Sequence, residues 1–108
     1  MNTASIELAI TEAVRRIVME IQPRRVILFG SAARGDMGPE SDLDFLIVMP
    51  NGTDCLSITG RIHRILRGLG CPKDVVVVLE HDMSVHAHNP ALIIHTALTE
   101  GRELYHAA

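Results

Sequence analysis

The sequence has 108 residues, a length that fits one hydrophobic core, so residues 1–108 are expected to form a single domain. Its 10 basic and 13 acidic residues give a formal net charge of −3, which argues against a protein that coats nucleic acid by neutralising phosphates. Hydrophobic residues make up 47%, yet there are only two Phe, one Tyr and no Trp, so the core must be mainly aliphatic, as where helices cover a β-sheet.

Targeting signals are not evident in the sequence. No apolar stretch approaches the roughly 20 residues that a membrane helix needs. Glu7 and Glu12 interrupt the first apolar pattern, unlike the core of a signal peptide. Cys55 and Cys71 lack the spacing of a metal site and are expected to be buried free thiols. A reducing compartment fits such thiols, so we expect a cytoplasmic protein.

The first third of the chain predicts a helix, a strand and a helical turn. Apolar residues recur at helical spacing over residues 3–22, and Pro23 ends this amphipathic helix. Residues 25–29 are short and β-branched, which predicts a strand. Residues 31–34 are expected to form a first helical turn, and the Gly, Pro, Asp and Ser of residues 35–41 indicate a loop.

The rest of the chain alternates between strands and helices. Residues 42–49 predict a strand that is apolar after its two acids, and a helix is expected from residue 54 or 56 to residue 69. Four consecutive valines in residues 74–79 predict a strand buried on both faces or nearly so. The pair Asn89-Pro90 suits a cap and a first helical position, so the last helix is expected to run from there to Glu100, with Gly101 closing it.

Acidic residues open two of these strands. Asp42 and Asp44 are two apart on a strand, so their side chains project to the same face with Cα atoms about 6.5 Å apart. Two such carboxylates beside apolar strands repel each other, and a bound Mg²⁺ would remove the conflict. Asp74, if on a neighbouring strand, could hold a second ion and take a proton from an attacking hydroxyl. Taken alone, these acids would equally fit strand-end caps and salt bridges.

A glycine-serine turn follows the first predicted strand. Gly30 would let the backbone approach a ligand, and Ser31 would offer a hydroxyl and a helix-start N–H to an anion. Arg34, one turn later, could add charge to bind phosphates. In isolation the same residues would fit an ordinary tight turn with a serine cap. The pattern of a P-loop is not present in the sequence.

The combined pattern resembles a known superfamily. Residues 29–35 (FGSAARG) followed by residues 41–44 (SDLD) resemble the signature of the nucleotidyltransferases that include DNA polymerase beta. With Asp74-Val75-Val76 downstream, the chain is most similar to the minimal nucleotidyltransferase (MNT) proteins of bacteria and archaea, over nearly its whole length. The resemblance implies the nucleotidyltransferase fold, an α/β (α+β) domain with a small mixed sheet and helices packed mainly on one face.

The resemblance also implies roles for individual residues. Gly30 and Ser31 would hold the triphosphate, with Arg34 as a further nucleotide-binding residue. Asp42 and Asp44 would bind Mg²⁺, with two ions expected, and Asp74 would complete the catalytic triad as the third acid and metal ligand. The reaction implied is transfer of a nucleotidyl group from ATP or another nucleoside triphosphate to a hydroxyl.

The resemblance suggests a partner as well. Larger relatives carry a helical domain that binds the acceptor, and this chain extends only shortly past Tyr105, so it is expected to borrow one. MNT proteins commonly pair with a helical HEPN toxin, in some cases adding AMP to a tyrosine of it, which implies an antitoxin role. A non-catalytic antitoxin that acts by binding alone, and the catalytic half of a two-chain transferase for a small hydroxylated molecule, remain alternatives. A homodimer is a further expectation, and direct nucleic-acid binding is not expected.

Some other residues invite a functional reading. The spacing of four histidines matches no familiar zinc site, so they are expected to be surface or core residues: His81, His86, His88 and His95. Tyr105, the only tyrosine, would anchor the carboxyl end or, alternatively, be a site of self-modification.

Overall fold

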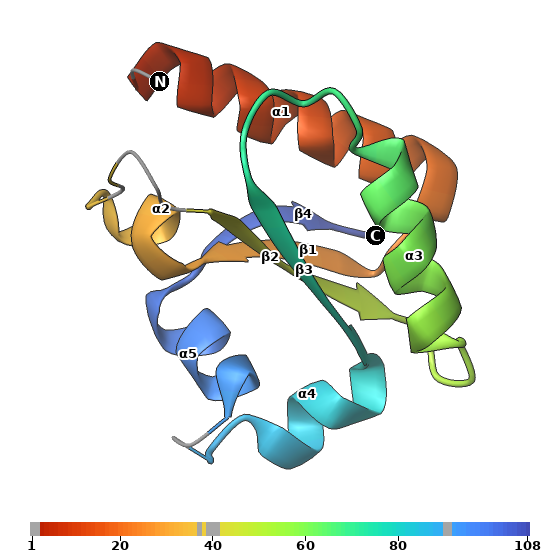
Figure 1. Cartoon of the computed structure of the whole chain (residues 1–108). Helices are drawn as coiled ribbons and strands as arrows, with labels where there is room; N and C mark the ends of the chain where they lie inside the picture. The colour runs from red at the N-terminus through yellow and green to blue at the C-terminus, as the bar shows by residue number, and fades with distance from the viewer. Residues whose placement is uncertain (1–2, 37, 39–41, 90–91) are drawn as a thin grey trace.

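The computed structural model describes residues 3–36, 38, 42–89 and 92–108. A four-stranded sheet lies between two sets of helices (Figure 1). The elements in chain order are α1 (Thr3–Ile21), β1 (Arg25–Phe29), α2 (Gly30–Arg34), β2 (Leu43–Met49), α3 (Cys55–Ile65), β3 (Lys73–Leu79), α4 (Glu80–His86), α5 (Ile93–Glu100) and β4 (Arg102–His106).

The sheet is mixed, as the resemblance implies. The strand order is β3-β2-β1-β4. β1 pairs antiparallel with both β2 and β4, while β2 and β3 are parallel. Parallel neighbours need a crossover connection, and α3 supplies it between β2 and β3. The starts of β2 and β3 therefore lie at the same end of the sheet as the end of β1.

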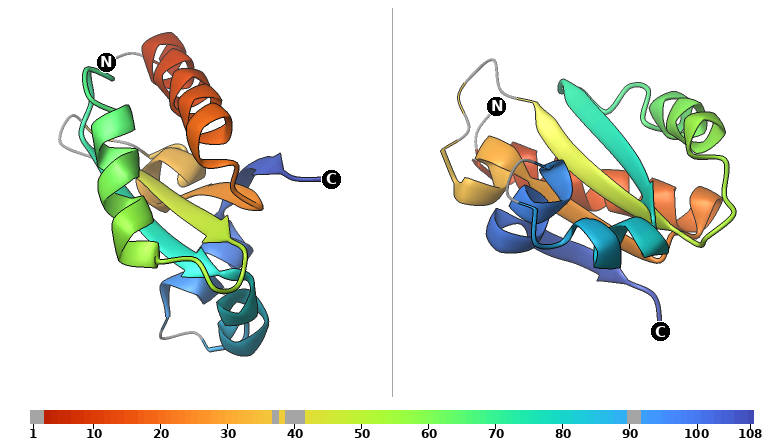
Figure 2. Two further views of the ribbon diagram at one scale, coloured as in Figure 1. Left: turned by 90° about the vertical axis from the view of Figure 1, so that its right-hand side faces the viewer. Right: turned by 90° about the horizontal axis from the view of Figure 1, so that it is seen from below.

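Hydrophobic side chains fill both faces of the sheet. The two longest helices, α1 and α3, cover one face, where they pack with alternate strand residues such as Leu28, Phe45 and Ile47 (Figure 2). The shorter helices α4 and α5 cover the other face, where Leu46 and Val48 are buried. This two-sided burial explains why β2 reads as an unbroken apolar run instead of an alternating one.

Two elements were not foreseen from the sequence. The segment of α4 carries one buried side chain, Met83, so it shows no apolar periodicity. Strand β4 has no buried residue, and it is held by pairing with β1 and by an ion pair between Arg25 and Glu103 (2.6 Å). Both elements depend on tertiary contacts instead of a local sequence pattern.

Two helix boundaries and the burial of one strand differ from the predictions. The second long helix ends at Ile65, because the backbone tightens there and Arg67 N–H donates to the Arg64 carbonyl (3.3 Å). The last helix begins at Ile93, because Leu92 N–H first closes a turn onto the Asn89 carbonyl (3.1 Å). Pro90 lies outside the described residues. The four valines are not buried throughout, because β3 is an edge strand and only Val75 is buried.

Membrane-crossing helices are not found in the described ranges: none of their helices has the length and hydropathy needed to cross a bilayer.

Candidate functional site

Two of the acids predicted as site residues lie side by side in the sheet. Asp44 of β2 is the register partner of Asp74 of β3, and on its other side Asp44 is the partner of Phe29, the last residue of β1. Neighbouring strands are about 4.8 Å apart, so the two carboxyl groups are within reach of a shared ligand. Asp44 thus lies between the end of β1 and the start of β3.

All of these acids lie at the sheet end where β1 leads into α2. Because side chains alternate along a strand, Asp44 and Asp74 point to the face that carries Leu46 and Val76, the face covered by α4 and α5. Asp42 immediately precedes β2, is exposed, and is two residues from Asp44. Asp44 and Asp74 therefore share one end and one face of the sheet, whereas Asp42, expected from its spacing to share the face of Asp44, lies just before the first residue of β2.

The environment of Asp44 disfavours its charge. Burial raises the pKa of its carboxyl group, and the negative charges of Asp74 and Asp42 raise that pKa further, while Arg34 opposes them. A carboxylate that is partly buried beside two other carboxylates needs either a proton or a cation. The folded chain therefore holds unfavourable negative charge at this point.

The donor set is suited to a hard divalent cation. The three side chains offer only carboxylate oxygens, which Mg²⁺ prefers over nitrogen or sulfur ligands. One oxygen of Asp74 already accepts a hydrogen bond from the N–H of Val75 (3.0 Å). Within the described ranges, no three His, Cys, Asp or Glu side chains are gathered closely enough to hold a metal ion by themselves. Metal binding by Asp42, Asp44 and Asp74 stays a prediction that the chemistry of the donors supports.

Gly30 packs directly against Asp44. Its φ is 73°, in the left-handed region, and a Cβ built on it would overlap Oδ2 of Asp44. The sequence suggests a glycine here so that a ligand can approach, and the structure adds a second reason, the space taken by the acid. Ser31 follows in the first turn of α2, and its carbonyl accepts from the N–H groups of Gly35 and Asp36. The turn is thus adjacent to the acids.

Arg34 connects the turn to a helix on the acidic face. Its guanidinium forms ion pairs with Asp36 (3.3 Å) and with Glu100 of α5 (3.5 Å). Its charge also reaches Asp44, whose pKa it lowers. Arg34 therefore lies near the acids as predicted, but two carboxylates already neutralise it in this structure. Glu100 was not singled out in the sequence, because nothing local links it to Arg34.

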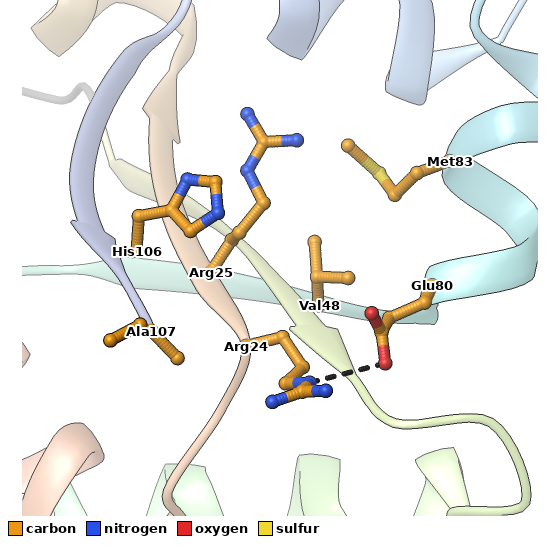
Figure 3. Close-up of a pocket in the computed structure, with 8 residues that line it drawn as sticks. Arg24, Arg25, Val48, Glu80, Met83, His106 and Ala107 are labelled. Atoms are coloured by element: carbon orange, nitrogen blue, oxygen red, sulfur yellow. Dashed lines mark hydrogen bonds and ion pairs between the residues drawn. The ribbon is translucent and has the colours of Figure 1, made fainter.

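A cavity lies at the end of the strands opposite to the acids. It has a volume of about 290 Å³ and is lined mainly by the start of β1, the start of α4 and the end of β4 (Figure 3). Arg24 in its wall pairs with Glu80 (3.2 Å), while Arg25 and His106 both pair with Glu103 (2.6 and 3.1 Å). Its cationic side chains are matched by carboxylates, so its charge gives no reason to expect an anionic ligand.

Other residues considered in the sequence lie away from the acids. Tyr105 is the partner of Val26 near the start of β1, and it packs with the α1 face. It is therefore separated from Asp44 along the strand and by the thickness of the sheet, which argues against self-modification within one chain. Cys71 is buried and Cys55 half-buried, and both are free thiols as expected.

Comparisons with known proteins add independent findings. A family model described as nucleotidyltransferase domain matches residues 10–97. No curated protein matches the sequence closely enough to count as a relative. A solved structure of a putative nucleotidyltransferase from Sulfolobus solfataricus is similar, with a TM-score of 0.61 and 22% identity, over 98% of this chain and 90% of that one.

Two further solved structures are similar in fold. One is described as a toxin-antitoxin with AMP-PNP, with a TM-score of 0.57 and 16% identity. The other is a mutant of the toxin-antitoxin MntA-HpeT, with a TM-score of 0.55 and 14% identity. Each match covers 90% of this chain and 73% of the other. At these identities the likeness concerns the fold.

Proposed function

Because this chain belongs to the nucleotidyltransferase domain family, we propose that it transfers a nucleotidyl group, AMP from ATP, to a hydroxyl group with the help of Mg²⁺. One observation carries the proposal: Asp44 and Asp74 are register partners at the end of the sheet where Gly30 begins α2. That arrangement supports the binding of one ligand by both the acids and the turn.

The proposed binding roles divide between the turn and the acids. Gly30 and Ser31 receive the triphosphate through backbone N–H groups and the Ser31 hydroxyl, and Arg34 adds positive charge. Asp42, Asp44 and Asp74 would hold Mg²⁺. When bound, the ions neutralise charge on the phosphates and on the oxygens that attack and leave.

The proposed chemistry is an in-line displacement at the α-phosphorus. The acceptor oxygen forms a bond to that phosphorus, and the bond from the phosphorus to the oxygen bridging to the β-phosphate breaks. Pyrophosphate leaves with the electron pair of that bond. The proton of the acceptor hydroxyl passes to the carboxylate of Asp74, the acid farthest from the Gly30 turn in the strand order.

For the acceptor we propose a tyrosine of a helical HEPN toxin, whose activity the modification would neutralise. The two similar structures described as toxin-antitoxin, one of them with an ATP analogue, support this choice. The test is to incubate the chain with ATP, Mg²⁺ and the product of the neighbouring reading frame. The expected result is an increase in the mass of that product by one adenylyl group, the mass of AMP less one water. If pyrophosphate is released but the mass of that product does not change, the proposed acceptor is wrong.

A second candidate function is neutralisation by binding alone. Exposed apolar side chains on α4 and α5, Val85 and Ile93, offer a surface on which a partner could pack. The double variant Asp42→Asn with Asp44→Asn separates the two functions, because it removes the proposed metal ligands and leaves that surface intact. Loss of neutralisation would favour catalysis, and unchanged neutralisation would favour binding. A two-chain transferase for a small molecule would instead be favoured if the neighbouring chain bound a hydroxylated metabolite.

A further inference from the structure

A hollow of about 520 Å³ opens on the same face of the sheet as Asp44 and Asp74. Val76 and Val78 of β3 form one wall, and Leu92, Ile93 and Ile94 at the start of α5 form another. α4 contributes Asp82 and His86. The hollow is thus mainly aliphatic, although it lies beside an acidic site.

The hollow lies farther along β3 than Asp74, on the same face of the strand. Asp74, Val76 and Val78 are successive residues of one face, each step covering about 6.5 Å. Across the sheet, β1 with the Gly30 turn lies on one side of β2 and β3 lies on the other. A triphosphate bound at the turn therefore approaches Asp44 from the β1 side.

The geometry of the displacement then fixes where the acceptor enters. The attacking and leaving oxygens lie roughly in line on opposite sides of the phosphorus. With pyrophosphate leaving toward the Gly30 turn, the acceptor hydroxyl has to come from the β3 side. The hollow opens on that side, and its first lining residue on β3, Val76, is two residues beyond Asp74.

The chemistry of the walls selects among acceptors. Five of the seven lining residues are aliphatic, which favours apolar groups over the hydroxyls of a sugar. Asp82 uses one oxygen to accept from the N–H of Leu79 (2.9 Å), and its negative charge disfavours the phosphates of a nucleic acid. Ile93 is 49% exposed at the rim, so it offers apolar surface to a partner.

Building on the proposed transfer, we propose that this hollow docks the acceptor and that the acceptor is a protein segment with apolar side chains next to its hydroxyl. An acceptor of this kind fills the aliphatic walls while its hydroxyl reaches Asp74. A sugar or a nucleic-acid end would leave those walls without matching groups.

The test compares variants of one rim residue. Ile93→Glu puts a charge into the hollow, and Ile93→Leu keeps it apolar. Leu56→Glu is the matched control, because Leu56 is 84% exposed on α3, on the other face of the sheet. Each protein is given ATP labelled in its α-phosphate, Mg²⁺, and either the product of the neighbouring reading frame or an oligoribonucleotide with a free 3′-hydroxyl.

We expect Ile93→Glu to lower kcat/KM for transfer to the protein by about tenfold or more, since a charge in a docking pocket typically costs this much. Leu56→Glu should stay within about twofold of the parent in kcat/KM, and Ile93→Leu should retain more transfer than Ile93→Glu because the rim stays apolar. The affinity of each variant for ATP should match that of the parent, because position 93 and position 56 lie outside the proposed nucleotide site. Equal transfer by Ile93→Glu, or preferred transfer to the oligoribonucleotide, would overturn the docking proposal and leave nucleotidyl transfer intact.

A photo-reactive amino acid in place of Ile93, compared with one in place of Leu56, reports docking without chemistry. One outcome is that the partner is crosslinked from position 93 and not from position 56, while no transfer is detected. That outcome would support the docking surface and refute the proposed transfer. With neither crosslinking nor transfer, both proposals fail.

Discussion

Gly30 and the carboxylate of Asp44 occupy adjoining space, so that a single added methyl group at Gly30 would overlap Oδ2 of the acid. Gly30 also has a φ of 73°, which side chains other than glycine adopt at a cost. Two separate physical reasons therefore require glycine at this position. They link the conformation of the turn to the position of the acid.

The first prediction concerns Gly30→Ala. We expect a loss of stability of about 1–3 kcal/mol from backbone strain and steric overlap, together with loss of transfer because Asp44 is displaced. Urea unfolding and labelled-ATP transfer measure the two effects. Gly60→Ala is the control: its Cβ would meet only Arg64 Nη1 at 3.5 Å, within α3. It should gain about 0.5–1 kcal/mol as an alanine in a helix. Equal stability of Gly30→Ala and the parent would contradict the packing described.

The second prediction is that Asp44→Asn stabilises the protein. Folding raises the pKa of Asp44. At pH values between the unfolded and folded pKa, the folded state therefore binds more protons than the unfolded state, and stability falls as the pH rises through this range. Removing the charge should raise Tm at pH 7 by about 2–4 °C, with the gain shrinking as the pH falls and Asp44 protonates. Melting curves from pH 4 to pH 8 test this. Glu20→Gln, which removes one exposed acidic side chain on α1, is the control for the loss of a single negative charge.

The third prediction concerns Mg²⁺. If the ion binds at Asp44, it competes with the proton that the raised pKa favours, so its affinity should fall as the pH is lowered through that pKa. Mg²⁺ should raise Tm of the parent at pH 8, and chelation with EDTA should reverse the rise. In Asp44→Asn the rise should be largely lost. A Tm response to Mg²⁺ that is the same in the variant and the parent would place the ion elsewhere.

The fourth prediction concerns the packing of α1 on α3. Arg16 donates to the carbonyls of Ile65 (3.2 Å) and Arg67 (3.1 Å), which lie at and just after the end of α3. Arg16→Ala should cost about 1–2 kcal/mol, because charge-assisted bonds and the packing of its stem are lost. Arg15→Ala should cost about 0.5 kcal/mol or less, because Arg15 pairs with the same Glu12 but is exposed. Urea unfolding of the two variants measures both costs. A cost for Arg16→Ala that is no larger than the cost for Arg15→Ala would contradict the bridging role of Arg16.

The fifth prediction follows from Glu12. Its hydrogen bonds to Arg15 and Arg16 lower its pKa to about 2. A lowered pKa in the folded state contributes stability above the unfolded value of 4.5, and this contribution is lost as the pH falls toward 2. Glu12→Gln should therefore be less stable than the parent at pH 7, and the two should converge near pH 2. A difference that persists unchanged at pH 2 would assign the effect to packing instead of charge.

Local sequence patterns predicted much of this fold. The β1 strand runs over residues 25–29 as expected, since a short β-branched segment bounded by Pro23 and Gly30 has few alternatives. The helix of residues 3–22 appears as Thr3–Ile21 for a similar reason. In contrast, β4 begins with two charged residues and has no buried residue, and only its partner β1 makes it a strand. Such pairing cannot be read from a single segment.

The sequence singled out the residues of the candidate site, whose roles stay predictions, but it did not give their arrangement. The spacing of Asp42 and Asp44 indicated that they share a face, while the neighbouring position of Asp74 depends on β2 and β3 being parallel and in register. The Arg34–Glu100 ion pair joins residues that are far apart in the sequence, so no motif could reveal it. The hollow beside Asp74 was missed because α4 has no helical pattern of its own.

Gly101 alone joins α5 to β4, and an added Cβ there would overlap the Ala97 carbonyl oxygen and the side chain of Ile27. α5, which lines the hollow, is thus connected by a single residue to β4, and β4 pairs with β1, the strand that leads into the Gly30 turn. Lengthening the chain by one residue at this junction would shift α5 against the acids, whereas the Pro50–Thr53 turn between β2 and α3 is remote from them. Engineers who wish to vary the acceptor can therefore redesign side chains in the hollow, but should leave this junction at its present length.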